Sequence, residues 1–326
     1  MATIATPKGK NPIERVARRL DAVQRRHKWL AFLFAVVKKF GEDDAGSKAA
    51  LIAYYGFFSL FPLLLVFTTV LGFVLSGHTA LQDKILHSAL RQFPIIGNQI
   101  GTSSQSLKGS GVALAIGLIG TLWAGMGVTQ AGENAMNAVW NVPARKLPNA
   151  LFSRLRGLVF LVIFGIGVLA TTFLAGFGAS GANVAAKIGA IAVGALINFA
   201  MFLVAFRVLT AQKLSWRDVL PGAVVATVLW EVLQGVGGWY VARSLKGASQ
   251  VYGFFAIVIG LLGWLYLGAQ MTLLAAEINV VLKRRLWPRS LVQPPLTMKD
   301  KEALQSLAMM EERRPEEEIV VRFKDS

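Results

Sequence analysis

Residues 48–76 read KAALIAYYGFFSLFPLLLVFTTVLGFVLS, and none of them is charged after the first. A helix of this length can cross a hydrocarbon core of about 30 Å. Pro62 lacks the amide hydrogen that would bond the carbonyl of Phe58, which predicts a kink near Phe58. That carbonyl is expected to be bonded by the hydroxyl of Ser59 or Tyr55, or by a polar group on a neighbouring helix. The stretch therefore predicts a membrane span that faces other helices.

The composition of the whole chain also indicates a membrane protein. Of 326 residues, 54% are hydrophobic and only 16% are charged, which is too apolar for an ordinary soluble domain. The chain has no cysteine, which excludes disulfides, thiolate nucleophiles and cysteine-ligated metals. It also lacks a nucleotide-binding glycine motif, which argues against a nucleotide-driven pump. We expect an all-α chain with no bound cofactor and no metal.

Five further apolar stretches follow, each near or above the roughly 20 residues that a span needs. Their approximate bounds are residues 110–131, 157–179, 185–206, 219–242 and 252–282. Small residues, such as Gly120 with Ala124 and Gly165 near Gly167, permit close helix packing. The sequence therefore predicts a polytopic fold with six transmembrane helices. The predicted parts are a basic arm at 1–47, the six-helix domain at 48–285 and a tail at 286–326.

The basic residues are divided unequally between the two sides of these spans. Of 34 lysines and arginines, all but 6 fall in the arm and the start of the first span, the stretches at 141–156 and 207–218, the stretch at 283–285, and the tail. The positive-inside rule places these segments in the cytoplasm. An even number of spans also requires both termini on one side. We therefore expect both termini to be cytoplasmic, in a multi-pass protein of the bacterial inner membrane.

The arm is predicted to form a basic amphipathic helix that begins at Asn11 and Pro12. Its apolar continuation at 29–37 is about nine residues long, which is too short to span. The helix is therefore expected to lie along the anionic cytoplasmic leaflet, with a solvated basic arm as the alternative. No cleavable signal peptide is expected before it, so the first span would act as the insertion signal.

Two more segments have simple interpretations. Residues 77–109 are predicted to form one or two short interfacial helices, and His78 and His87 within them are assigned no site because a third ligand is missing. The tail is predicted to be a mobile appendage with a helix over 297–313 and a solvated acidic run at 316–318.

Polar residues inside the spans are the candidates for function, because ionisable groups are costly in hydrocarbon. Glu231 is predicted near mid-bilayer, with Asn198 and Arg207 as candidate partners. Glu133 and Glu277 lie toward the cytoplasmic ends of their spans. The residues predicted to line a polar path are Glu231, Gln234, Thr227, Glu133, Gln130, Asn137, Glu277 and Gln270. The alternative is that they only hydrogen-bond one helix to another.

An ordered series of motifs resembles the YihY/BrkB family of inner-membrane proteins. The motifs are AAxxAYYxxFSLFPLLL at 49–65, NAVW at 137–140, LPGA at 220–223, YG at 252–253, WLY at 264–266 and EIN at 277–279. Ala275 stands where the family suggests glycine, and Phe254 where it suggests a small residue. The resemblance implies a six-helix membrane protein but little chemistry, since the family's activity is not settled. The motif and helix-kink positions singled out are Tyr54, Tyr55, Ser59, Pro62, Pro221 and Gly222.

Three classes of function follow from these observations. A transporter or lipid-handling protein is favoured, because polar faces could line a path while Pro62 and Pro221 permit helix rearrangement. A non-catalytic envelope-integrity scaffold is the alternative. A membrane-bound ribonuclease is least expected, although part of the family has carried a ribonuclease BN label, since His27 would be the only cytosolic histidine. The expected partners are anionic phospholipid headgroups and not nucleic acid, and a homo-oligomer is compatible with the sequence.

Overall fold

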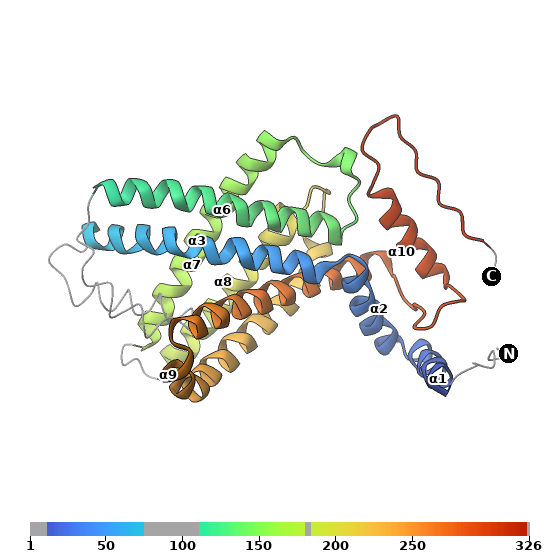
Figure 1. The fold of residues 1–326 in the computed structure, drawn as a ribbon, viewed down its shortest axis with the longest axis horizontal. Coiled ribbons are helices and arrows are strands. Elements are labelled where there is room, and N and C mark those ends of the chain that lie inside the picture. The colour runs from blue at the N-terminus through green and yellow to red at the C-terminus, as the bar shows by residue number, and fades with distance from the viewer. Residues whose placement is uncertain (1–11, 75–110, 180–183, 325–326) are drawn as a thin grey trace.

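The computed structural model describes residues 12–74, 111–179 and 184–324, and these residues form a helical bundle without strands (Figure 1). The segment at 77–109, with His78 and His87, lies outside the described ranges. The helices are α1 (Pro12–Arg26), α2 (Lys28–Glu42), α3 (Ala45–Val74), α6 (Gly111–Val139), α7 (Ala150–Ala179), α8 (Val184–Val208), α9 (Trp216–Arg284) and α10 (Met298–Met309), with a short 3₁₀ turn η2 (Ala144–Lys146). The all-α prediction is confirmed for the part of the chain that is described.

Helix α9 is a continuous run of 69 residues that turns back on itself (Figure 1). Its two arms touch because glycine stands at the crossing points. A Cβ on Gly222 would overlap the carbonyl oxygen of Ala275, and one on Gly237 would overlap the ring of Trp264. Gly222 also donates its backbone N–H to the side chain of Asn279 at 2.6 Å. The fifth and sixth predicted spans are therefore the two antiparallel arms of α9.

Four stretches in the described ranges are long and apolar enough to cross a membrane. They are Ala150–Leu174, Val184–Val208, Trp216–Gly237 and Val258–Arg284. Their outward faces are apolar: Leu220, Val224, Val228, Val232 and Val236 are all exposed along the first arm of α9. A soluble protein would bury such a stripe, whereas lipid solvates it. The first two predicted spans fall on α3 and α6, which contain 30 and 29 residues.

Helices α3 and α6 pack closely side by side through small residues on α6 (Figure 1). A Cβ on Gly120 would lie 3.1 Å from the Cβ of Pro62, and one on Gly127 would lie 2.7 Å from the ring of Tyr55. Close packing at Gly120 is thus confirmed, whereas a Cβ on Gly165 would meet no atom within 4 Å. Helix α3 continues through Pro62.

Of the partners expected for the carbonyl of Phe58, the hydroxyl of Ser59 does not bond it. That hydroxyl instead donates to the carbonyl of Gly56, three residues back, at 2.7 Å. A serine hydroxyl reaches such a carbonyl easily, because it lies on the preceding turn of the same helix.

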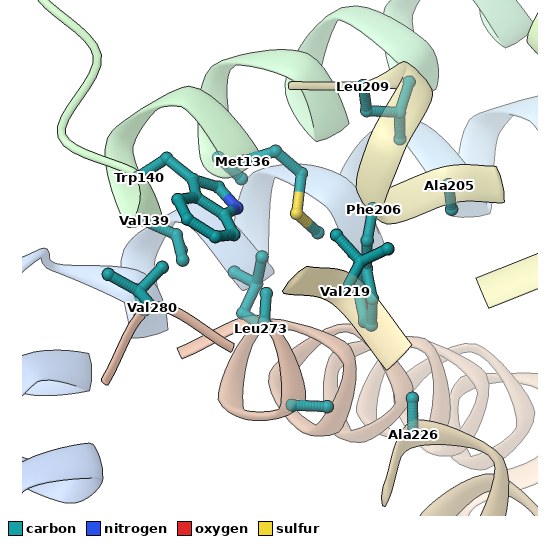
Figure 2. Close-up of a cluster of buried hydrophobic side chains, with 14 of the residues drawn as sticks. Met136, Val139, Trp140, Ala205, Phe206, Leu209, Val219, Ala226, Leu273 and Val280 are labelled. Carbon is teal, nitrogen blue, oxygen red and sulfur yellow. The ribbon is translucent and has the colours of Figure 1, made fainter. Parts of the chain in front are cut away.

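The largest group of buried hydrophobic side chains gathers at one end of the bundle, where α2 joins it. Figure 2 shows Met136 of α6 and Trp140, just past the end of α6, facing Leu273 and Val280 of α9, with Phe206 of α8 beside them. All five side chains are nearly or fully buried. This end of the bundle therefore has the dry interior of a soluble protein, and the candidate site lies within it.

The arm and the tail both differ from their predictions. The arm forms two helices instead of one, with His27 as the N-cap of α2. The tail is not a mobile appendage at its beginning, because Arg289 is fully buried against α2. Helix α10 begins one residue after its cap Thr297, which accepts a hydrogen bond from Asp300. It ends at Met309, short of the predicted residue 313.

Candidate functional site

Three charged side chains meet in the dry end of the bundle, and we call them the buried charge cluster. They are Lys39 and Asp43 from the end of α2 and Glu277 from the second arm of α9, at 2%, 5% and 0% exposure. The ammonium of Lys39 contacts Asp43 Oδ2, lies 2.8 Å from the carbonyl of Val139 and lies 3.2 Å from Glu277 Oε2. The contacts with Asp43 and with the carbonyl of Val139 are hydrogen bonds, whereas the contact with Glu277 is an ion pair.

The local sequence explains how two members of the cluster come together. Lys39 and Asp43 are four residues apart, so their side chains lie on one face of α2. Asp43 is the C-cap of that helix, and Asp44 follows with a left-handed φ of 50° that turns the chain into α3. Aspartate tolerates this conformation better than most residues. The turn holds Asp43 between two helices.

A second layer of polar contacts surrounds Asp43. Asn141, just past the end of α6, donates to Asp43 Oδ1 at 3.1 Å. The guanidinium of Arg284 binds the side-chain oxygen of Asn141 at 3.3 Å and the carbonyl of Trp140 at 2.5 Å. Lys48 donates to the backbone carbonyl of Asp43 at 2.7 Å. Helices α2, α3, α6 and α9 therefore all contribute to the site.

Of the three charged side chains in the cluster, Glu277 has the fewest interactions that offset the burial of its carboxylate. Neither oxygen of its carboxylate has a hydrogen-bond partner within the described part of the chain, although the residue is completely buried. The direct cationic contact of its carboxylate is Lys39, which also binds Asp43. Two carboxylates thus share one ammonium in a place that water does not reach. Two like charges held this close, with a single ammonium between them, repel each other.

A second charged group binds the tail to the other side of α2, and we call it the tail clasp. Arg289 forms a bidentate pair with Glu42, at 2.8 Å to each oxygen, and donates to Asp300 at 2.9 Å. Lys38 donates to Asp300 at 2.8 Å and to the carbonyl of Ser290 at 2.7 Å. Planar bidentate pairs of this kind are among the stronger hydrogen-bonded ion pairs.

The pKa of Asp300 reflects this environment. Burial alone raises the pKa of the carboxyl, but hydrogen bonds from Lys38, Ser290 and Thr297 outweigh burial and hold the pKa well below its usual range. Asp300 is therefore ionised throughout the physiological range.

The other predicted site residues have separate partners. Glu133, which is buried, accepts from Ser153 and pairs with Arg156 Nε at 3.2 Å, which joins α6 to α7. Asn137 accepts from the backbone N–H of Ala211 at 2.7 Å. Gln130 is exposed and lines a small hollow with Met126, Thr129, Glu133, Ser153 and Arg154.

Glu231 lies on the first arm of α9, away from the end of the bundle where the buried hydrophobic side chains gather. Its Oε1 accepts from Asn198 of α8 at 2.9 Å, so Asn198 is a partner, as predicted. Thr227 donates to the carbonyl of Ala223 at 2.8 Å within its own helix. Gln234 and Gln270 are half-buried on the two arms of α9. The three predicted glutamates therefore bind different partners on different helices.

Sequence reasoning identified Glu277 but missed Lys39 and Asp43. Both lie in the arm, before the first predicted span, where charged residues are ordinary. A signal was present, because two adjacent lysines are followed at four-residue spacing by two adjacent acids, Glu42 and Asp43. That pattern places a charge pair on each of two neighbouring faces of one helix.

Comparison with known proteins assigns a family. The family model described as Virulence factor BrkB matches residues 36–297. The ribonuclease-like protein YfkH of Bacillus subtilis (strain 168) is 25% identical over 272 residues, covering 78% of this chain and 96% of its own. The UPF0761 membrane protein Smlt0865 of Stenotrophomonas maltophilia (strain K279a) is 25% identical over 294 residues, covering 82% of this chain.

A further relative is the UPF0761 membrane protein RSc1559 of Ralstonia nicotianae, which is 27% identical over 275 residues and 78% of this chain. The chain spans 64% of the length of Smlt0865 and 59% of that of RSc1559. No solved structure matches the chain. The matched region begins within α2 and runs past the tail clasp arginine, so it contains the buried charge cluster. The chain belongs to the virulence factor BrkB family and is a membrane protein.

Proposed function

We propose that this chain is a transport or lipid-handling protein of the bacterial inner membrane, in which the buried charge cluster takes up and releases a proton. The observation that carries the proposal is the sharing of one buried ammonium, that of Lys39, by the carboxylates of Asp43 and Glu277. Ionisable groups inside a membrane bundle are costly and are functional candidates by default.

The free-energy cost of burying these charges favours a functional role for the cluster over a purely stabilising one. Well-packed apolar residues of similar volume usually stabilise a protein as well as a buried ion pair does. The other nearby cations, Lys48 and Arg284, bind carbonyl or amide oxygens and do not bind either carboxylate. We infer that one of the two acids holds a proton when Lys39 is charged. Loss of that proton would leave an uncompensated charge and favour a different packing of α2 against α9.

We further propose that α3, α6, α7, α8 and the two arms of α9 make six crossings. Figure 1 draws α1, α2 and α10 at the same end of the bundle, which supports placing both termini on one side. The concentration of lysine and arginine at this end supports a cytoplasmic location. In this arrangement residues 48–285 form the membrane domain. The arm at 1–47 and the tail at 286–326 form one cytoplasmic unit, because the tail clasp joins them.

A non-catalytic scaffold is the second candidate, and one observation favours it. Glu231 and Glu133 each have a partner on a neighbouring helix, which is what helix-to-helix hydrogen bonding requires. We do not propose an enzyme. His27 is exposed, with its Nδ1 at 3.1 Å from the carbonyl of Val23, and the described residues hold no group of three or more potential metal ligands. A ribonuclease site would need clustered acids, histidines or metals.

Reconstitution tests the proposal. The full chain is placed in liposomes that carry a pH gradient, and flux is measured for a panel of ions, amphiphiles and phospholipids. We expect a transported species for the wild type and loss of its flux in Glu277→Gln, because an amide keeps the shape but cannot release a proton. Glu231→Gln is the matched control and should transport normally. Equal flux in Glu277→Gln and the wild type, at matched abundance, would refute a protonation role.

A different result would favour the scaffold. If no member of the panel moves, and the wild-type chain co-purifies with a stoichiometric envelope protein, the transport proposal fails. The cluster would then be a structural device that fixes α2 on the bundle.

A further inference from the structure

The two amino-terminal helices each present an apolar face that no other part of the described chain covers, and we call the two faces together the apolar strip. Val16, Leu20 and Val23 of α1 are exposed, as are Trp29, Leu33 and Val37 of α2, and each of the six is 49% to 63% exposed. Within each helix the spacing is three or four residues, so each set lies on one face. This strip lies outside the bundle, on helices too short to cross a membrane.

Basic side chains lie beside the strip on α1. Arg15, Arg19 and Arg26 are exposed and form no ion pair with any residue in the described ranges. With 100° between successive residues, these three positions fall within about 40° of one another and directly border Val16 and Val23. The remaining two arginines of α1 are different, since Arg18 pairs with Glu14 and Arg25 pairs with Asp21. The unpaired cations are therefore the ones on the apolar side.

The side of α1 opposite the three arginines is fixed by the tail. Asp21 and Gln24 are buried, at 8% and 9% exposure. Asp21 accepts from the backbone N–H of Leu291 at 2.8 Å, and Gln24 donates to the carbonyl of Arg289 at 2.6 Å. The tail clasp in turn holds this tail segment on α2. The apolar and basic face of α1 is thus held outward, facing away from the rest of the protein.

The position of these helices relative to the bundle indicates what covers the strip. Helix α2 ends at Glu42 and α3 begins at Ala45, so α2 lies directly at the entry of the first proposed span. Figure 1 shows α1 and α2 extending sideways from the end of the bundle. A helix at that level meets the headgroup region, where apolar side chains enter the acyl boundary and arginines meet phosphates.

We propose that α1 and α2 form an anionic-phospholipid-binding surface on the cytoplasmic leaflet, oriented by the tail. The six apolar side chains enter the edge of the acyl region, and Arg15, Arg19 and Arg26 bind anionic headgroups. This inference goes beyond the proposed function. It does not depend on whether the buried charge cluster exchanges a proton.

Spin labelling tests the surface directly, since the chain has no native cysteine. Leu20→Cys and Leu33→Cys place a label on the strip, and Ala22→Cys places a matched label at an exposed position of α1 outside it. The full chain is studied in nanodiscs of phosphatidylcholine, with or without phosphatidylglycerol. We expect collisions with oxygen to exceed those with a water-soluble nickel complex several-fold at the strip positions. The opposite order is expected at Ala22→Cys.

The combined variant Arg15→Gln, Arg19→Gln and Arg26→Gln tests the choice of lipid. In the wild-type background, phosphatidylglycerol should increase the oxygen preference at Leu20→Cys, and the combined variant should lose that increase. An unchanged increase would show that these arginines do not bind the anionic lipid. Strip labels as accessible to nickel as Ala22→Cys would overturn the proposal. Low collision rates with both reagents, together with dipolar coupling between labels on two copies, would show that a second copy of the chain covers the strip. That result would also overturn the proposal.

Discussion

Lys38 and Lys39 are adjacent in the sequence and bind opposite parts of the molecule. Lys38 Nζ lies 2.8 Å from Asp300 in the tail, whereas Lys39 Nζ lies 3.2 Å from Glu277 on the second arm of α9. Glu42 and Asp43 repeat this division one turn later, because Glu42 binds Arg289 and Asp43 binds Lys39. One short helix therefore connects the tail to the interior of the bundle.

Removal of the shared ammonium should destabilise the fold strongly. Lys39→Met removes the cation that contacts both buried acidic side chains, which costs about 3–5 kcal/mol of unfolding free energy. Denaturant titration in detergent micelles measures this loss. The combined variant with Asp43→Asn and Glu277→Gln should recover part of it, because no buried charge then remains unpaired. Lys39→Met with wild-type stability would contradict the buried cluster.

The tail clasp should resist acid until well below neutral pH. Because the pKa of Asp300 is lowered in the folded state, its contribution to stability is fully present above its unfolded pKa of about 4. That contribution is lost as the pH falls toward the folded-state pKa. Hydrogen exchange at residues 289–300 should stay protected from pH 8 to about pH 5. Asp300→Asn should exchange faster at every pH, and equal protection in the variant would argue against the clasp.

Glu231 should behave as a structural residue. Glu231→Gln retains a side-chain oxygen that can accept from Asn198, so it should preserve stability. Glu231→Ala should cost roughly 1–3 kcal/mol, because the amide of Asn198 is left unpaired. A double-mutant cycle with Asn198→Ala isolates the pair. Loss of transport in Glu231→Gln at normal stability would restore the predicted polar path.

The arms of α9 should tolerate added methyl groups only where there is space. Gly222→Ala places a Cβ against the carbonyl of Ala275, and Gly237→Ala places one against the ring of Trp264. Each should destabilise the fold by about 1–3 kcal/mol, as overpacking usually does. The Cβ that Gly235→Ala adds would meet no atom within 4 Å. This substitution should leave the stability of the fold unchanged or raise it by up to about 1 kcal/mol. Equal melting temperatures for Gly235→Ala and Gly237→Ala would contradict the packing of the two arms.

The proposed topology predicts the location of reporter fusions. Reporters after residues 45, 150, 212 and 300 should be cytoplasmic, because basic residues flank these positions. Reporters near residues 95, 182 and 247 should be external. A cytoplasmic signal at residue 247 would show that the two arms of α9 do not both cross the membrane.

Local features of the sequence determined much of the architecture. The length of uncharged apolar stretches is sufficient to identify membrane helices, since hydrocarbon forces the backbone to satisfy its own hydrogen bonds. The boundaries of α8 follow the predicted span at 185–206 closely, whereas α9 runs as one helix through both of the last two predicted spans. A polar residue deep in a span also narrows the choice of partners, which is why Asn198 was a candidate partner for Glu231. These inferences depend only on residues that are close together in the sequence.

Tertiary structure alone decided which charges meet. Lys39 and Glu277 are far apart in the chain, and nothing in the local pattern of either helix specifies their contact. Arg289 was assigned to a mobile tail because prolines and charges surround it, yet packing buries it completely. Likewise, Gly237 and Gly235 are indistinguishable by sequence, and only the crossing of the two arms crowds the first. Long-range pairing depends on how whole helices fit together, because the distance between two side chains in space is set by packing and not by their separation along the chain.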